Sequence, residues 1–367
     1  MSGRLFPALV AILLGVIVGA LSFVPFVAVQ YRRVGRLTAW QGLLWAGFVV
    51  YGLALWTYTL LPLPDTAAIR CVPAQLRPFN FIDDILDYPA GSAGQLVRNP
   101  AVMQVALNVM LFVPLGFFVR AIWRRGFLVT TLAGLAMSLM IEVTQHTGVY
   151  GVYPCAYRLF DVDDLLANTT GALLGGLLSV AIVPWLARRD EGAAPLRPRP
   201  VTFWRRLLAM FCDVLAVWLL GGVAGMLVNL WRIVVLGVDA TPLDQTPANV
   251  AAALVPLVLL GALVLGTGRT VGDHAVLLRW EGGKRPEPVA RTLRYLGGIG
   301  GWQLLTLAGS SLDLLFVVVG VVMLLTVKDR GGLPGVLSGM RPVDVREPDG
   351  EGDPATGRGS GQAGHDR

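Results

Sequence analysis

The sequence predicts an all-α protein, a polytopic transmembrane helical bundle with about 8–9 membrane segments in two halves. Hydrophobic residues make up 54% of its 367 residues and charged residues only 15%, whereas soluble domains carry about 25% charged residues. Apolar runs of about 20 residues, the length that crosses a bilayer, recur along the chain. These runs occupy residues 5–30, 38–62, 101–122, 126–147, 161–186, 205–230, 248–267 and a longer stretch, 295–326.

The first and last runs need separate interpretation. Run 5–30 is too long for the apolar region of a signal peptide and lacks a small-residue cleavage site, so we interpret it as a span. Run 295–326 is too long for one span. The sequence "GSSLD" at 309–313 predicts a turn inside it, and a hairpin there brings the total to about nine segments.

Arginines mark alternate loops, and loops rich in Arg and Lys stay in the cytoplasm. They are Arg32, Arg33 and Arg36 after the first span, Arg120, Arg124 and Arg125 after the third, and six arginines from Arg188 to Arg206. We therefore expect a membrane protein with its N-terminus outside and its C-terminus in the cytoplasm, and the family resemblance given below implies a bacterial cell membrane. Loops 63–100 and 148–160 then lie outside. The net charge of +6 reflects this topology, and no basic, aromatic-interleaved surface indicates a nucleic-acid partner.

The stretch "ARRDEGAAPLRPRP" at 187–200 is rich in Pro and Arg and predicts a linker between the halves. From Arg341 the chain is rich in Gly, Asp, Pro and Arg, which is typical of disorder. The expected organisation is an extra N-terminal helix with its cytoplasmic loop at 1–36, a first transmembrane domain at 37–187, a cytoplasmic linker at 188–202, a second transmembrane domain at 203–342 and a disordered tail at 343–367.

Polar residues of the first half meet at one depth. Asn108 and Asn168 lie about 10 Å inside their spans and Glu142 about 7 Å, at about 1.5 Å per helical residue. Helical spacing places neighbouring polar residues on the same faces. The sequence thus predicts an acidic pocket that opens toward the outer leaflet. Its candidate residues are Asn108, Glu142, Gln145, His146, Arg158, Asp161, Asp163, Asp164 and Asn168.

Simpler roles also fit several of these residues. Asp161 and Asp163 could cap the fifth span, with Arg158 as a surface counter-ion. Asn108 and Asn168 could join helices by hydrogen bonds. Glu142 favours function more strongly, because a carboxylate inside an apolar helix is costly.

Other chemistries have little support in the sequence. HExxH, G-x-S-x-G, P-loop and dinucleotide motifs are missing, so we expect no metal and no cofactor, and lean against an enzyme. Cys71 and Cys155 fall in loops expected outside, where either a disulfide or two free thiols would fit. Gly171 and Gly175 have the small-xxx-small spacing that lets helices approach closely.

Five successive blocks resemble the VanZ-like membrane family over about residues 40–186: "YGLALWTYTLLPLP", "LRPFNFI", "NVMLFVPLGFFVR", "IEVTQ" and "RLFDVDDLLANTTGALLGG". The resemblance implies a role like low-level resistance to the glycopeptide teicoplanin. The residues that fall on the family pattern are Asn108, Pro114, Gly116, Glu142, Gln145, Arg158, Asp161, Asp164, Asn168 and Gly171.

The second half, 203–342, resembles the RDD family through "RRLLAMFCDVLAVWLL" and "GTGRTVGD". Arg206 and Asp213 fall on its first Arg and Asp, seven residues apart on one helical face. The chain departs from the family pattern at Gly335, where an Asp is usual, and at Asp273, where a basic residue is expected.

Three functions follow from these observations. The first is a binding or envelope-modifying protein whose pocket takes an envelope component, such as a lipid-linked wall precursor or a glycopeptide. The second is a transporter or ion-coupled carrier, and the third is an enzyme acting on a lipid head group. A carrier needs a polar path across the membrane, and no chain of charges in the sequence supplies one, which favours the pocket.

Overall fold

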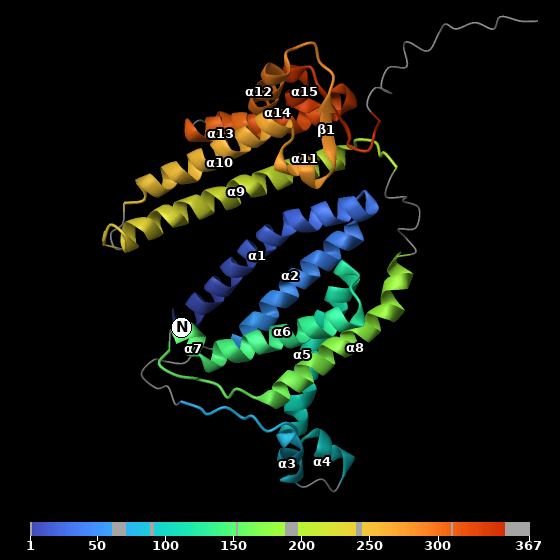
Figure 1. The fold of residues 1–367 in the computed structure, drawn as a ribbon, viewed down its shortest axis with the longest axis vertical. Helices are drawn as coiled ribbons and strands as arrows, with labels where there is room; N and C mark the ends of the chain where they lie inside the picture. Colours follow the sequence, from blue (N-terminus) through green and yellow to red (C-terminus); the bar gives the residue numbers. More distant parts are fainter. Residues whose placement is uncertain are drawn as a thin grey trace, which may run out of the picture. The chain divides into compact units, whose positions relative to one another are not determined.

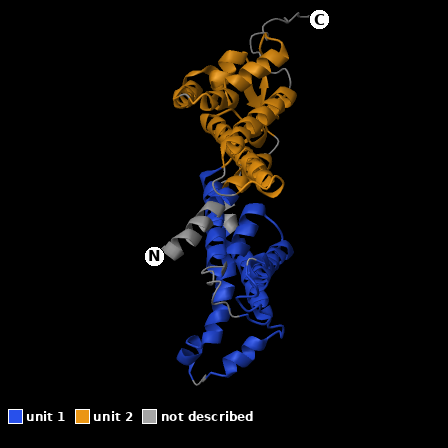
Figure 2. Cartoon of the chain, turned by 90° about the vertical axis from the view of Figure 1, so that its left-hand side faces the viewer, with its two compact units in different colours: residues 1–19, 38–192 blue, residues 20–37, 193–367 orange. Residues whose placement is uncertain are grey.

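The computed structural model describes residues 2–60, 71–88, 92–151, 153–187, 197–239, 244–309 and 311–348. The chain forms two compact units (Figure 2). Unit 1 comprises residues 1–19 and 38–192, and unit 2 comprises residues 20–37 and 193–367. Most of the expected linker, residues 188–196, lies outside the described residues.

The expected all-α fold is confirmed (Figure 1). Helix α1 (Ser2–Val34) contributes to both units. Unit 1 further contains α2 (Ala39–Leu60), α3 (Asn80–Leu86), α4 (Ala93–Val97), α5 (Pro100–Trp123), α6 (Phe127–His146), α7 (Gly148–Gly151) and α8 (Val162–Ala187). Unit 2 contains α9 (Phe203–Val234), α10 (Thr246–Thr267), α11 (Val271–Ala275), β1 (Leu278–Glu281), α12 (Glu287–Leu296), α13 (Ile299–Leu307), α14 (Leu312–Thr326), η2 (Lys328–Arg330), α15 (Gly332–Ser338) and β2 (Arg341–Asp344).

Within the described residues, seven helices are long and apolar enough to cross a membrane. They are α1, α2, α5, α6, α8, α9 and α10. Run 295–326 is interrupted between α13 and α14, where the sequence predicted the turn of a hairpin. The two helices, however, have only 9 and 15 residues. At 1.5 Å per residue they reach about 14 and 23 Å, less than the roughly 30 Å of the hydrocarbon core. Neither crosses a bilayer as a full-length span.

Unit 1 is organised around the close pair of α5 and α8. An added Cβ at Gly116 would lie 1.8 Å from the Ala172 carbonyl oxygen, and one at Gly171 would lie 2.2 Å from that of Val109. Glycine therefore lets the two backbones touch, as the small-residue spacing of Gly171 and Gly175 indicated. An apolar core of α2, α5 and α6 side chains packs beside this pair, with Phe112 fully buried.

Capping residues set where the long helices begin. Asn99 accepts from the backbone N–H groups of Ala101 and Val102 and is followed by Pro100, so α5 starts there. The side chain of Thr202 accepts from the Arg205 N–H at the start of α9. Both helices therefore have defined N-terminal ends.

The predicted disorder from Arg341 onward is wrong for residues 341–348. Strand β2 pairs antiparallel with β1, and Asp344 is fully buried. Its carboxylate forms an ion pair with Arg205 at 2.9 Å and accepts from the Arg199 N–H. Composition suggested a tail, but this buried ion pair holds the segment in place. Residues 349–367 lie outside the described residues.

Arg206 and Asp213, which the sequence places on one face of α9, do not form an ion pair with each other in unit 2. Seven residues separate them, about 10.5 Å along a helix, which is too far for a direct ion pair. Instead Arg206 binds Asp273 of α11 at 3.0 Å. Asp213 accepts a hydrogen bond from the Gly272 N–H at 2.7 Å. Both side chains thus bind residues of α11.

Candidate functional site

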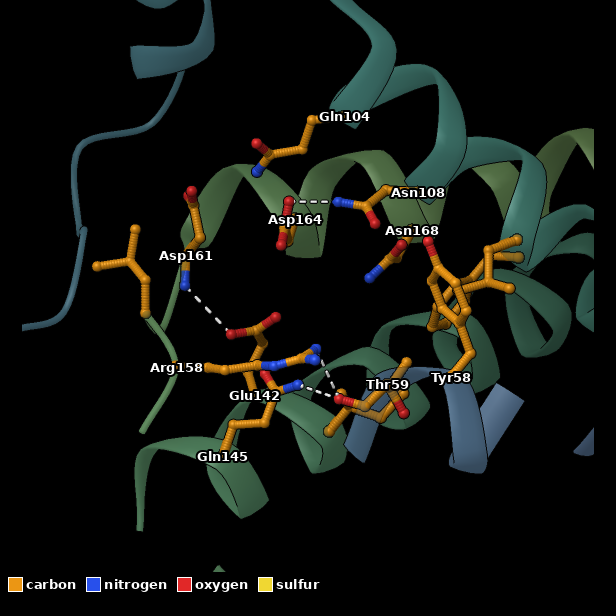
Figure 3. A pocket seen from close by; sticks show the side chains of 14 residues that line it. Tyr58, Thr59, Gln104, Asn108, Glu142, Gln145, Arg158, Asp161, Asp164 and Asn168 are labelled. Carbon is orange, nitrogen blue, oxygen red and sulfur yellow. Dashed lines mark hydrogen bonds between the residues drawn. The ribbon is translucent and has the colours of Figure 1, made fainter. Parts of the chain in front are cut away.

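A cavity of about 250 Å³ lies at one end of the unit 1 bundle (Figure 3). The C-terminal ends of α2 and α6 and the N-terminal parts of α5 and α8 surround it, together with the segment before α8. Its lining residues are Tyr58, Thr59, Gln104, Asn108, Leu111, Phe112, Ile141, Glu142, Gln145, Arg158, Leu159, Asp161, Asp164 and Asn168. Seven of the nine residues that the sequence predicted for the pocket therefore lie together.

One wall is built on the last turn of α2. Main-chain carbonyls in a last helical turn have no helical donor. The Thr59 carbonyl oxygen accepts from the Gln145 side-chain amide at 2.7 Å and from the Arg158 guanidinium at 2.9 Å (Figure 3). A cation at a helix C-terminus also interacts favourably with the helix dipole. Both side chains are therefore donors that serve α2, and Arg158 is not merely a surface counter-ion.

The opposite side brings Glu142 to the start of α8. Glu142 is only 4% exposed, and one of its carboxylate oxygens accepts from the Asp161 N–H at 3.2 Å. The Asp161 side chain in turn accepts from the Asp163 N–H at 2.8 Å, the N-cap interaction that the sequence allowed. Asp161 thus caps α8 and lines the cavity at once. Burial raises the pKa of Asp161 above its ordinary value, although the bond from Asp163 lowers it in part.

Two asparagines complete the polar lining. Asn108 donates its side-chain amide to Asp164 across the α5–α8 contact (Figure 3). Asn168 donates to the Ser138 hydroxyl at 2.9 Å, so it joins α8 to α6. Asn168 is only 6% exposed, and its side-chain oxygen Oδ1 is buried without a hydrogen-bond partner. An unsatisfied buried acceptor is costly. Among the lining residues that the structure describes, this oxygen is a buried acceptor without a partner.

The segment at the mouth of the cavity is held by bonds outside it. Cys71 and Cys155 form a disulfide with their Cα atoms 5.5 Å apart. Asp163 lies on the other side of α8 from Asp161 and accepts from the Phe79 and Phe81 N–H groups at 2.6 and 2.8 Å. These bonds fix the chain that carries Arg158 and Asp161.

The two remaining predicted residues do not line the cavity. Asp163 lies two residues after Asp161, about 200° around the helix, and anchors the loop instead. His146 is the last residue of α6, is exposed, and has its ring 5.7 Å from that of Phe160. Sequence reasoning missed Tyr58, Thr59 and Gln104. Gln104 lies one turn before Asn108, so helical spacing could have found it, whereas Thr59 contributes a main-chain carbonyl that no side-chain pattern reveals.

Comparison with known proteins agrees with part of the predicted resemblance. Residues 48–183 match the family model described as VanZ/LLP1. This part of the chain is VanZ-like. Every residue that lines the cavity lies within the VanZ-like region. The match ends before α9, so the RDD resemblance of residues 203–342 stays a prediction. Comparisons with curated proteins and with solved structures find no match.

Proposed function

We propose that the VanZ-like region binds a component of the cell envelope in its polar cavity, in a role similar to glycopeptide resistance. The observation that carries the proposal is the convergence of Glu142, Asp161 and Asp164 on one cavity from separate helices. A carboxylate inside a membrane helix is costly and indicates function by default. The VanZ/LLP1 match supports the link to glycopeptides at the level of the family.

The position of the cavity supports a binding role over transport. Its polar residues come from the same end of the unit 1 bundle. Phe112 and Ile141, almost fully buried, close it with apolar surface, and Leu115 and Val119 continue the core beyond it. A pocket closed on its inner side by apolar side chains would suit a head group at the membrane surface. A carrier would need a polar route through this apolar core.

The size of the cavity favours a chemical group over a whole antibiotic. Pockets that enclose a drug-sized molecule measure about 300–1,000 Å³. The roughly 250 Å³ here is smaller. A head group or a short polar arm of a wall precursor or glycopeptide is the kind of ligand that such a volume takes.

The topology belongs to the same proposal. The arginine-rich loops favour a cavity that faces the outside of the cell. Reporter fusions test this: a fusion at Tyr150 should be active only with an external reporter, and one at Gly192 only with a cytoplasmic reporter. The reversed pattern would turn the cavity toward the cytoplasm and remove its access to external envelope components.

The decisive experiment is mass spectrometry of the lipids and wall precursors that co-purify with the full-length protein. We expect at least one bound component to be lost in the Glu142→Gln, Asp164→Asn double variant, whose amides keep the shape but remove the charge. Asp87→Asn, the same change at an exposed residue of unit 1, should retain it. The teicoplanin susceptibility of cells that express each variant should follow the bound component: it should change with the double variant and stay as in the wild type with Asp87→Asn. Identical bound components in all three proteins would contradict the proposal.

A further inference from the structure

The cavity lining carries three carboxyl groups, which accept hydrogen bonds. One N–H group of the Gln145 amide and one of the Arg158 guanidinium are bound to the Thr59 carbonyl. A carboxylate offers about four acceptor positions. The Glu142 side chain receives one backbone N–H, from Asp161, and Figure 3 shows its other oxygen turned toward the cavity. The carboxyl groups of the lining can therefore accept hydrogen bonds from a ligand.

A buried, unpartnered oxygen independently points to a ligand. Asn168 is one of the lining residues and only 6% of its surface is exposed, and its Oδ1 is buried without a hydrogen-bond partner. The amide nitrogen is bound to Ser138, which orients the oxygen. A donor supplied by a ligand would satisfy it, and leaving it empty is unfavourable.

The charged groups of the lining favour a cationic ligand. The lining contains three carboxyl groups, of Glu142, Asp161 and Asp164, and one guanidinium, of Arg158. A cationic ligand would offset this excess of acids. Within the described residues no three His, Cys, Asp or Glu side chains come together as a metal site. Several acceptors spread around a cavity suit a group that carries several N–H donors better than a single ion.

From these observations, and resting on the proposed function, we propose that the cavity binds a primary ammonium group, donated by a lipid head group or by a soluble amine. A primary ammonium has three N–H donors, and each bond to a carboxylate is charge-assisted. The Asn168 oxygen accepts one of these donors. A quaternary ammonium is disfavoured because it has no N–H and is typically recognised by an aromatic cage. The described lining has only two aromatic side chains, Tyr58 and Phe112.

The test compares two head groups of equal charge that differ in N–H donors. The full-length protein is placed in phosphatidylglycerol nanodiscs with either phosphatidylethanolamine or phosphatidylcholine of identical acyl chains. Lipids retained by the released protein are counted by native mass spectrometry. We expect about tenfold preferential retention of phosphatidylethanolamine, the scale of one charge-assisted hydrogen bond.

Variants of the lining residues test whether the preference for phosphatidylethanolamine arises in the cavity. Glu142→Gln with Asp164→Asn, and separately Asn168→Leu, should abolish the preference, whereas Asp87→Asn should keep it. The comparison of the two lipids in the wild-type protein needs no variant, so a variant that fails to fold does not leave the proposal untested. A preference that persists in both correctly folded pocket variants would place the amine elsewhere and overturn the proposal.

A second arm distinguishes the source of the amine. Ethanolamine should raise the melting temperature of the protein and choline at the same concentration should not, since a ligand of the folded state stabilises it. A response to ethanolamine without a lipid preference supports the ammonium site and identifies a soluble amine as its source. No discrimination in either arm overturns the ammonium assignment. The proposed function would survive that result if another envelope component is still lost in the double variant, and would fail with it if none is.

Discussion

The two units bury acidic groups in opposite ways. In unit 2, Asp273 is 1% exposed and accepts from Arg206, Arg294 and the Trp280 indole, at 3.0, 2.9 and 2.9 Å. In unit 1, the carboxylates of Glu142 and Asp164 adjoin a cavity. Because buried charges require partners, Asp273 of unit 2 has its counter-ions within the chain, while Glu142 and Asp164 of unit 1 are positioned to receive one. A buried acid in a membrane protein thus indicates a site when the fold leaves space beside it.

Removing the charge of Asp273 should have the largest effect on stability. Asp273→Asn leaves Arg206 and Arg294 buried without a counter-ion. Breaking a buried ion pair from one side costs about 3–5 kcal/mol. We expect the free energy of unfolding of the full-length protein in detergent to fall by that amount, as measured by denaturant titration. Glu287→Gln is the matched control, because it breaks the surface ion pair with Arg291, and such pairs are worth about 0–1 kcal/mol. Equal losses of unfolding free energy in the two variants would show that the buried ion pairs of Asp273 stabilise the fold no more than the surface ion pair of Glu287.

Acid should reproduce part of this loss. Burial alone would raise the pKa of Asp273, but the guanidinium groups of Arg206 and Arg294 outweigh it and hold the pKa below the ordinary value of 3.8. A carboxyl with a lowered folded-state pKa stabilises the fold above its unfolded pKa, and this stability is lost as pH falls through the folded value. The stability advantage of the wild type over Asp273→Asn should therefore be constant above about pH 5 and shrink below pH 3.8. Melting temperatures of both proteins from pH 3 to 7 measure this advantage. An advantage that grows as the pH falls would show that the pKa of Asp273 is raised in the folded state and not lowered.

The stability of unit 1 should depend instead on its disulfide bond. The Cys71–Cys155 disulfide closes a separation of 84 residues, and native disulfides typically contribute about 2–4 kcal/mol. The Cys71→Ala, Cys155→Ala double variant should lose this much stability and bind less ligand, because the segment with Arg158 and Asp161 is then less constrained. Non-reducing peptide mapping should find the two cysteines linked. Two alkylatable thiols in protein from its native envelope would contradict the disulfide. Cys212→Ala, at the buried free cysteine, is the control for cysteine removal.

The smallest effect on stability is expected at the acids of the cavity. Glu142→Gln and Asp164→Asn should change the free energy of unfolding by less than about 1 kcal/mol, or increase it, because neutral side chains are easier to bury in a membrane helix. Ligand binding should nevertheless be lost. A loss of stability as large as that of Asp273→Asn would show that these acids are structural, and the contrast between the units would disappear.

The sequence by itself determined the membrane class, most long helices and seven of the fourteen residues that line the cavity. Bilayer thickness fixes the length of an apolar span, and the helical period places Glu142 and Gln145, or Asp161, Asp164 and Asn168, on shared faces. Both rules act locally along the chain, so they can be applied without a structure. They also located Gly171 and Gly175, where α5 approaches α8.

Only the tertiary structure decided which partner each polar group takes. Sequence spacing placed Arg206 and Asp213 on one helical face, but the ion-pair partner of Arg206 is Asp273 of α11, 67 residues away. The same holds for Asp344, which orders a segment whose composition suggested disorder, and for Asp163, which turns away from the cavity to bind the loop at Phe79 and Phe81. Ion pairs and hydrogen bonds act over about 3 Å, so they depend on which distant segments the fold brings together, and periodicity along one helix carries no information about that.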